Sequence, residues 1–329
     1  MKMKSNNERL DWIDNLRGGS ILAIIILHLP LALNGSPGYV TKYFHLLDII
    51  LGPMRLGLMF FISGMFVDAG LKKGISIYVK NKTKSILYPF VVWAIIYASL
   101  KILFMAKSNH QQSVWNVILM HVTGGGDITW FLHSLFIFFI IIIYARKIPI
   151  IPVLLTCTVL SCLIPVIHSD SVFSSFDNGH FNKSIYLFMF FYIGDYVIRK
   201  NIRLDNLEVG SVFIVSIISF LLITLINFNF NVKYQYLSPL ALASIPIFVF
   251  ISQKINFKFI AFIGANSIVF YLTHYLVIQI AAKLIKINNT SPLIQDVKFF
   301  VVLIMAVAIP YFICKLRTVG FFNYLFSAK

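Results

Sequence analysis

The chain has 329 residues, of which 59% are hydrophobic and 12% charged, and its formal net charge is +16. Soluble globular proteins carry about 45–50% apolar and about 25% charged residues, so this composition excludes a soluble enzyme, a disordered tail protein and a disulfide scaffold. Nearly every window of about 20 residues between Leu16 and Leu316 is dominated by Ile, Leu, Phe and Val. A helix of that length crosses a bilayer. The sequence therefore predicts an all-α fold, a polytopic integral membrane helical bundle.

Apolar runs of the required length occur ten times along the chain. We expect transmembrane helices near residues 15–33, 44–68, 85–106, 127–145, 149–168, 184–199, 209–228, 235–252, 258–285 and 297–317. A short apolar stretch at 114–122 predicts an interfacial helix in the third loop. No internal repeat is visible, and we expect residues 1–329 to form a single transmembrane domain with no fused soluble domain.

Basic residues divide unevenly between alternate loops of this layout. The N-terminal segment, the loops after the second, fourth, sixth and eighth spans and the C-terminal segment together carry most of the 28 Lys and Arg residues. By the positive-inside rule, both termini are predicted to be cytoplasmic. The net charge therefore reports membrane orientation and does not indicate a nucleic-acid partner. Cys157, Cys162 and Cys314 lie in apolar runs without metal-ligand spacing, so no metal is expected.

Two polar residues stand out in the first span because ionisable groups at membrane depth are costly and commonly functional. Arg17 and His28 are separated by about three helical turns, or ~16 Å of rise, and therefore share one helix face. An arginine binds phosphate at an aqueous surface, and a neutral imidazole in a dry cavity accepts a proton from a hydroxyl. Acyl-coenzyme A, with phosphates at one end and a thioester at the other, fits that spacing. The alternative is an interfacial anchor at Arg17 and a packing residue at His28.

Six short motifs, taken in order, resemble those of the membrane-bound acyltransferase 3 family of bacterial O-acyltransferases, and the opening is similar to the fucose 4-O-acetylase-like branch. The first motif is a basic residue, Arg17, followed eleven positions later by His28. It lies in the segment that opens at Arg9 with Arg-Leu-Asp-Trp-Ile-Asp-Asn-Leu-Arg-Gly. The other five are Phe-Phe-Ile-Ser-Gly-Met-Phe at 60–66, the basic cluster at 80–84 followed by Ser-Ile-Leu-Tyr-Pro-Phe, Trp-Phe-Leu at 130–132, Phe-Phe-Tyr-Ile-Gly at 190–194, and Ser-Ile-Val-Phe-Tyr-Leu-Thr-His at 267–274. The resemblance covers nearly the whole chain.

The resemblance implies roles for several residues. His28 would be the catalytic residue, either as general base or as a transient acyl carrier. Arg17, Lys80 and Lys84 would bind the phosphates of the donor, and Asp14 would orient Arg17 through an i,i+3 ion pair. The family usually has arginines in the second-loop cluster; lysine binds phosphate as a point charge and can keep the role.

Other polar or aromatic residues in the motifs are candidates for a cavity or for contact with the acceptor. His133, Tyr271 and His274 could line such a cavity, although structural hydrogen bonding explains the two histidines equally well. Ser63 precedes Gly64, where close helix packing is the alternative. Trp130 could stack on a sugar ring, or anchor its helix at the membrane interface.

The predicted function is a bacterial inner-membrane O-acyltransferase, most simply an O-acetyltransferase. Its partners would be acetyl-CoA as acyl donor, with no permanently bound cofactor, and a hydroxyl of a surface glycan such as a lipopolysaccharide O-antigen or an exopolysaccharide. The rival interpretation is a flippase or transporter of a lipid-linked glycan. Transporters often show internal repeats and paired acidic residues inside the membrane, and here Asp48 is the single acidic residue placed well inside a predicted span.

Overall fold

The computed structural model describes residues 11–32, 38–105, 113–124, 126–164, 179–204, 210–230, 232–255, 257–285, 291–317 and 320–328. All regular structure in these ranges is helical, which confirms the predicted fold class. The chain forms two compact units. Unit 1 comprises Met1–Ile62 and Lys200–Leu316, and unit 2 comprises Ser63–Arg199 and Arg317–Lys329. The single-domain layout stays a prediction.

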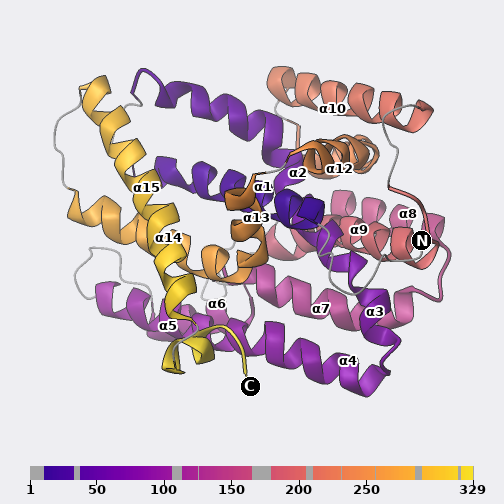
Figure 1. Ribbon diagram of the computed structural model, residues 1–329, viewed down its shortest axis with the longest axis horizontal. Helices are drawn as coiled ribbons and strands as arrows, with labels where there is room; N and C mark the ends of the chain where they lie inside the picture. The colour runs from indigo at the N-terminus through magenta and orange to yellow at the C-terminus, as the bar shows by residue number, and fades with distance from the viewer. Residues whose placement is uncertain are drawn as a thin grey trace. The chain divides into compact units, whose positions relative to one another are not determined.

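Unit 1 contains both ends of the apolar region of the sequence. Its α-helices are α1 (Asp11–His28), most of α2 (Phe44–Met65), α10 (Ser211–Phe230), α11 (Ser238–Ala243), α12 (Ile245–Lys254), α13 (Lys258–Ala265), α14 (Ser267–Leu284) and α15 (Pro292–Leu316). Short 3-10 segments are η1 (Leu29–Ala32), η2 (Thr41–Tyr43) and η4 (Tyr234–Leu237). In Figure 1, α14 and α15 cross in direct contact, and α10 lies beside α12.

Unit 2 holds the middle of the sequence. Its elements are α3 (Val67–Leu71), α4 (Ile75–Lys82), a π-helical turn η3 (Thr83–Leu87), α5 (Tyr88–Met105), α6 (Val114–Val122), α7 (Trp130–Ala145), α8 (Ile150–Leu163), α9 (Gly179–Arg199) and the 3-10 segment η5 (Gly320–Leu325). Helix α6 has the bounds predicted from the sequence; its interfacial location stays a prediction.

Every predicted span coincides with helix, but the helices differ from the predicted layout at three places. The predicted span 258–285 is wrong as one continuous helix, because α13 ends and α14 begins at Asn266. The predicted span 235–252 bends by 52° between α11 and α12. The third span starts earlier, since residues 75–104 form one continuous helical stretch.

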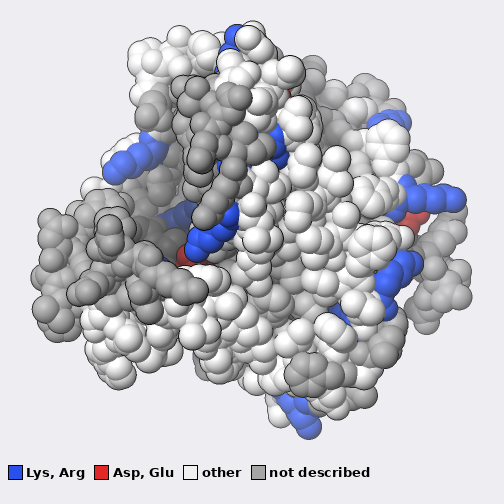
Figure 2. All heavy atoms as spheres, turned by 90° about the vertical axis from the view of Figure 1, so that its left-hand side faces the viewer, with Lys and Arg blue, Asp and Glu red and all other residues white. Residues whose placement is uncertain are grey.

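Within the described ranges, five helical stretches are long and apolar enough to cross a membrane, or six when the bent pair counts as one span. Many large apolar side chains are exposed in both units, such as Leu225 and Ile304 in unit 1 and Leu103 and Ile151 in unit 2. On the face shown in Figure 2, most described side chains are uncharged. The protein is therefore a multi-pass membrane protein. Ten spans and cytoplasmic termini remain predictions.

Close helix packing in unit 1 centres on α1. A Cβ atom at Gly18 would lie 2.0 Å from the Ile260 carbonyl oxygen, and one at Gly264 would lie 1.9 Å from the Asp14 carbonyl oxygen. Only glycine permits this approach of two helix backbones. The crossing of α1 and α13 therefore explains the glycine that directly follows Arg17, and it fixes the orientation of the face that carries Arg17 and His28.

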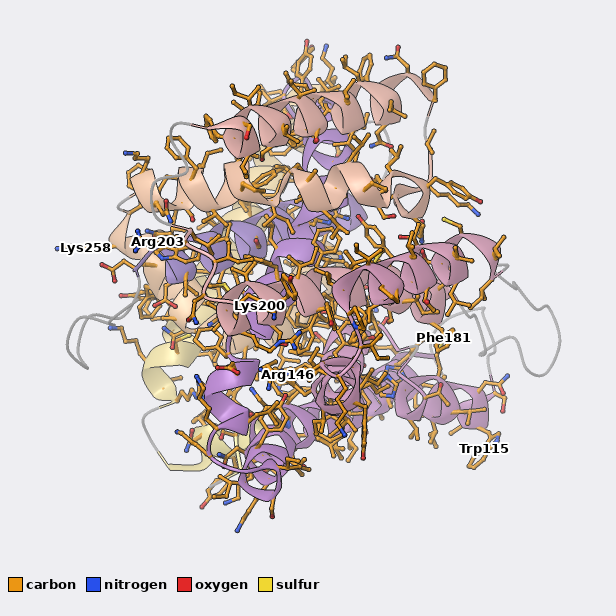
Figure 3. The ribbon with its side chains drawn as sticks, turned by 90° about the vertical axis from the view of Figure 1, so that its right-hand side faces the viewer. Trp115, Arg146, Phe181, Lys200, Arg203 and Lys258 are labelled. Carbon is orange, nitrogen blue, oxygen red and sulfur yellow. The ribbon has the colours of Figure 1, made fainter. Side chains whose placement is uncertain are left out.

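Hydrogen bonds place several connections at one end of unit 1. Asn15 Nδ2 donates to the Ile255 carbonyl (2.6 Å), and Gln253 Nε2 donates to the Leu204 carbonyl (2.8 Å). In Figure 3, Arg203 and Lys258 lie at the same edge of this unit. The start of α1 and the connections after the sixth and eighth predicted spans thus lie together, as the distribution of basic residues predicts. That this end is cytoplasmic stays a prediction.

Candidate functional site

The structure brings His28 and His274 together in unit 1, although 246 residues separate them in the sequence. His28 is the last residue of α1 and is half-buried, whereas His274 lies in the middle of α14 and is fully buried. His274 Nε2 and His28 Nδ1 are 3.2 Å apart, and the ring centroids are 5.3 Å apart. This distance is that of a hydrogen bond between the two imidazoles.

A backbone contact determines which nitrogen of each ring carries the proton. His274 Nδ1 lies 2.9 Å from the Phe270 carbonyl oxygen, which can only accept, so Nδ1 carries the hydrogen. In the neutral ring, His274 Nε2 is then an acceptor, and His28 Nδ1–H donates to it. The lone pair of neutral His28 consequently lies on Nε2. That is the arrangement required of a general base whose ring is oriented by a second group.

Aromatic side chains of α14 border the histidine pair. The Tyr275 ring meets His28 edge-on with centroids 5.5 Å apart, and the Tyr271 ring lies 5.9 Å from His274. Tyr271 is buried. These ring contacts restrict the orientation of the two imidazoles.

Arg17 and Asp14 lie at the other end of α1 from His28. Asp14 is buried and Arg17 is half-buried. The continuous helix Asp11–His28 confirms that Arg17 and His28 are on one helix about three turns apart. The Asp14–Arg17 ion pair stays a prediction.

A cavity of about 140 Å³ lies between α1, α2 and α12, along a different face of α1 from the one that carries Arg17 and His28. Its walls are mainly apolar. The polar side chains that line it are Asn15, Ser20, Arg55 and Ser252. Arg55 forms an ion pair with Asp48 of the same helix. Asp48 is the acidic residue that lies well inside the second predicted span, and Arg55 is its partner.

The predicted donor-binding lysines belong to unit 2. Lys80 is exposed on α4, and Lys84 is half-buried in the π-helical turn η3. The Lys84 carbonyl accepts a hydrogen bond from the Ala328 amide (3.3 Å), so the C-terminal segment and the basic cluster lie together. Both segments are predicted to be cytoplasmic. Because these lysines and His28 belong to different units, their joint action stays a prediction.

The remaining predicted site residues, Ser63, Trp130 and His133, also belong to unit 2. Gly64, next to Ser63, allows α2 to touch α9, because a Cβ atom there would lie 2.0 Å from the Phe191 carbonyl oxygen. Trp130 is buried, with Lys183 Nζ 4.7 Å from its ring centroid. The His133 ring packs against Gly124 and lies 5.4 Å from the Phe90 ring. Trp130 and His133 are three residues apart on α7 and therefore lie on one helix face. That the three residues contribute to one site stays a prediction.

Unit 2 also contains a buried network of ion pairs. Arg146 contacts Asp68 (2.5 Å) and Asp195 (3.1 Å), and Arg199 Nε lies 3.5 Å from the same Asp195 carboxylate. Asp195 and Arg199 are also one helical turn apart (i,i+4) on α9. The network joins the ends of α2–α3, α7 and α9. In Figure 3, Arg146 lies at the opposite end of this unit from Trp115 and Phe181.

Sequence reasoning missed two features of unit 1. Tyr275 was not assigned to the site, although its position directly after His274 could have indicated it. Lys298, the second residue of the predicted span 297–317, was not noted, and it is buried within α15. Its signal was a lysine at the start of an otherwise apolar run.

Comparison with known proteins adds one finding. The family described as an acyltransferase domain, acyltransferase 3, matches residues 10–315, a range that runs through both units. No curated protein and no solved structure matches the chain. The matched range contains the histidine pair and all the motifs except the first residue of the opening one. The chain therefore belongs to the acyltransferase 3 family, and it is a membrane acyltransferase.

Proposed function

We propose that the protein is a bacterial inner-membrane O-acetyltransferase that moves an acetyl group from cytoplasmic acetyl-CoA to a hydroxyl of a surface glycan sugar. O-antigen and exopolysaccharide units are the acceptors we propose. The acyltransferase 3 domain supports the transfer of an acyl group. The observation that carries the chemistry is the His274–His28 hydrogen bond, because it leaves the basic lone pair on His28 Nε2.

In the proposed reaction, His28 Nε2 removes the proton from the acceptor hydroxyl while its oxygen attacks the thioester carbonyl carbon. The carbonyl π electrons move to oxygen and give a tetrahedral oxyanion. When the C=O bond re-forms, the C–S bond breaks and coenzyme A leaves as the thiolate. The proton held by His28 then passes to sulfur, so the base is regenerated. His274 positions His28 and stabilises its protonated ring through the Nδ1–H contact.

A second route uses His28 as a transient acyl carrier, with the acetyl group held on Nε2 between two half-reactions. The same ring nitrogen serves both routes. They differ kinetically, because an acyl carrier releases coenzyme A before the acceptor binds.

The donor-binding residues that we propose are Arg17 of unit 1 and, in the basic cluster of unit 2, Lys80 and Lys84. Arg17 lies at the end of α1 that the charge pattern predicts to be cytoplasmic, where coenzyme A is available. A guanidinium binds phosphate bidentately, and Lys80 and Lys84 add point charges. Asp14 would hold the guanidinium in place.

The test is acetyl transfer by the purified protein in detergent micelles. Acetyl-CoA labelled in the acetyl group is incubated with glycan from a host that lacks the gene, and free thiol and glycan mass are followed together. We expect release of coenzyme A in step with a glycan mass increase of one acetyl group. Absence of both from folded protein would refute the proposed donor and acceptor.

A further inference from the structure

Lys298 is a buried cation inside an apolar helix. It lies in α15, a stretch long and apolar enough to span a membrane, and its side chain is 1% exposed. It shares the buried face of that helix with Phe299, Val302 and Ala306. Its Nζ atom makes no hydrogen bond with any residue that the structure describes. A lysine ammonium offers three donors, so this group lacks the interactions that normally compensate burial.

The described carboxylates of unit 1 do not neutralise Lys298. Asp296, two residues away, accepts hydrogen bonds from the amides of Val40 (3.0 Å) and Thr41 (3.0 Å). Asp48 is paired with Arg55. Within the described ranges, no ion pair joins Lys298 to any acidic side chain. An isolated buried ammonium is strongly unfavourable, so a compensating anion from beyond the described residues is the expected partner.

Lys298 lies on a helix that contacts the segments carrying the histidine pair. Helix α15 packs against α14, which carries His274, and against η1, the turn that directly follows His28. The contact of α15 with α14 is visible in Figure 1. An anion held by Lys298 would therefore be bound by a helix that contacts both α14 and the turn after His28.

We propose that Lys298 binds an anionic group, a carboxylate or a phosphate, carried by the acyl acceptor. The acceptor is then an acidic saccharide or a saccharide linked to a phosphate, and its hydroxyl is presented to His28 by the same binding event. This inference rests on the proposed function, because only that function makes the bound molecule an acyl acceptor. The anion site itself rests on the burial and isolation of Lys298.

The experiment measures binding without measuring acyl transfer. The thermal unfolding midpoint of the purified protein in detergent is recorded with glucose, glucuronate or glucose 1-phosphate, over a range of concentrations. Three variants accompany the wild type: Lys298→Met, Lys298→Arg, and Lys258→Met as a matched control, because Lys258 is an exposed lysine of the same unit.

We expect at least one anionic sugar to raise the wild-type midpoint by about 2 °C or more, and glucose to leave it unchanged. A response to glucuronate assigns the anion to a carboxylate, and a response to glucose 1-phosphate assigns it to a phosphate. Lys298→Met should lose the response, Lys298→Arg should keep part of it, and Lys258→Met should match the wild type. Without added sugar, Lys298→Met should be at least as stable as the wild type, because it removes an uncompensated buried charge.

Three results would overturn the proposal. The first is that neither anionic sugar raises the thermal midpoint of the wild type. The second is that the sugars raise the midpoint of Lys298→Met as much as that of the wild type. The third is that Lys298→Met is unfolded, or melts far below the wild type, without any sugar. The last result would show that the lysine is held by the fold itself. Failure of acetyl transfer with the anion response intact would instead refute the proposed function and leave the anion site in place.

Discussion

The two units place ionisable side chains inside apolar helices in opposite ways. In unit 2, Asp68 and Asp195 are surrounded by Arg146 and Arg199, and each charge faces its opposite at the distance of an ion pair. In unit 1, two imidazoles share one hydrogen bond, so the site offers a lone pair in place of balanced charges. Charges that neutralise each other hold helices together. A lone pair aligned by a second ring is suited to proton transfer.

The largest effect that we expect comes from breaking the network of unit 2. Asp195→Leu leaves Arg146 and Arg199 without their shared carboxylate, and losing one member of a buried ion pair costs about 3–5 kcal/mol. The protein should therefore melt at a much lower temperature and reach the membrane in smaller amounts. The measurement is the thermal midpoint in detergent.

A matched control for this prediction is Lys72→Met. Lys72 also pairs with Asp68, at 2.7 Å, but its side chain is 76% exposed. An exposed pair contributes about 0–1 kcal/mol, so the midpoint should hardly move. Equal losses in the two variants would show that the buried network has no special structural role.

The second prediction concerns the orientation of His28. His274→Ala removes the acceptor for His28 Nδ1–H, and we expect kcat to fall about 100-fold, or ~2.7 kcal/mol, with a small change in thermal stability. His274→Gln places an amide oxygen near the same point and should restore part of kcat. Initial rates at saturating acetyl-CoA test both variants. Full activity of the alanine variant would make His274 a packing residue.

A third, smaller effect separates donor binding from chemistry. Arg17→Ala removes a charge-assisted phosphate contact worth about 1.5–3 kcal/mol, so KM for acetyl-CoA should rise while kcat is nearly unchanged. Arg17→Lys should recover only part of the affinity, since it cannot bind phosphate bidentately. If coenzyme A binds the alanine variant as tightly as the wild type, Arg17 is an interfacial anchor.

The smallest expected effect comes from a change in the packing of α1 against α13, which orients the helix face that carries Arg17 and His28. Gly18→Ala puts a methyl group 2.0 Å from the Ile260 carbonyl oxygen and should cost about 1–3 kcal/mol of stability. Gly19→Ala meets no atom within 4 Å, so stability should be unchanged or slightly higher. Thermal midpoints of the two neighbouring variants give the comparison. A neutral Gly18→Ala would mean that α1 and α13 are not in backbone contact.

The sequence predicts the helices well because hydrophobic runs are local signals. Helix α6 has the bounds that its apolar stretch predicts, and every predicted span contains helix. The break at Asn266 was missed because the apolar run continues through it. The interruption depends on the contact of Gly264 with the backbone of α1 and on the Asn266 side chain, whose amide donates to the Phe262 carbonyl (2.9 Å).

The candidate site was predictable only in part. His28 and Arg17 follow from helical spacing within one span, and the family motifs indicate His274. That His274 contacts His28 could not be predicted, because the contact depends on how α1 and α14 pack rather than on any local pattern. Lys298 could have been noted from the sequence as a lysine next to an apolar run. Its burial and lack of a partner are properties of the packed structure.

We propose that this membrane acyltransferase uses His28 as its catalytic residue. The most direct test compares a host that lacks the gene with hosts that carry the wild type or His28→Ala, at equal levels of the protein in the membrane. The acyl content of the surface glycan is measured by mass spectrometry. We expect acylated glycan with the wild type and none with His28→Ala, whose thermal midpoint should be close to that of the wild type. Acylation by the His28→Ala variant at the level of the wild type would show that His28 is not the catalytic residue.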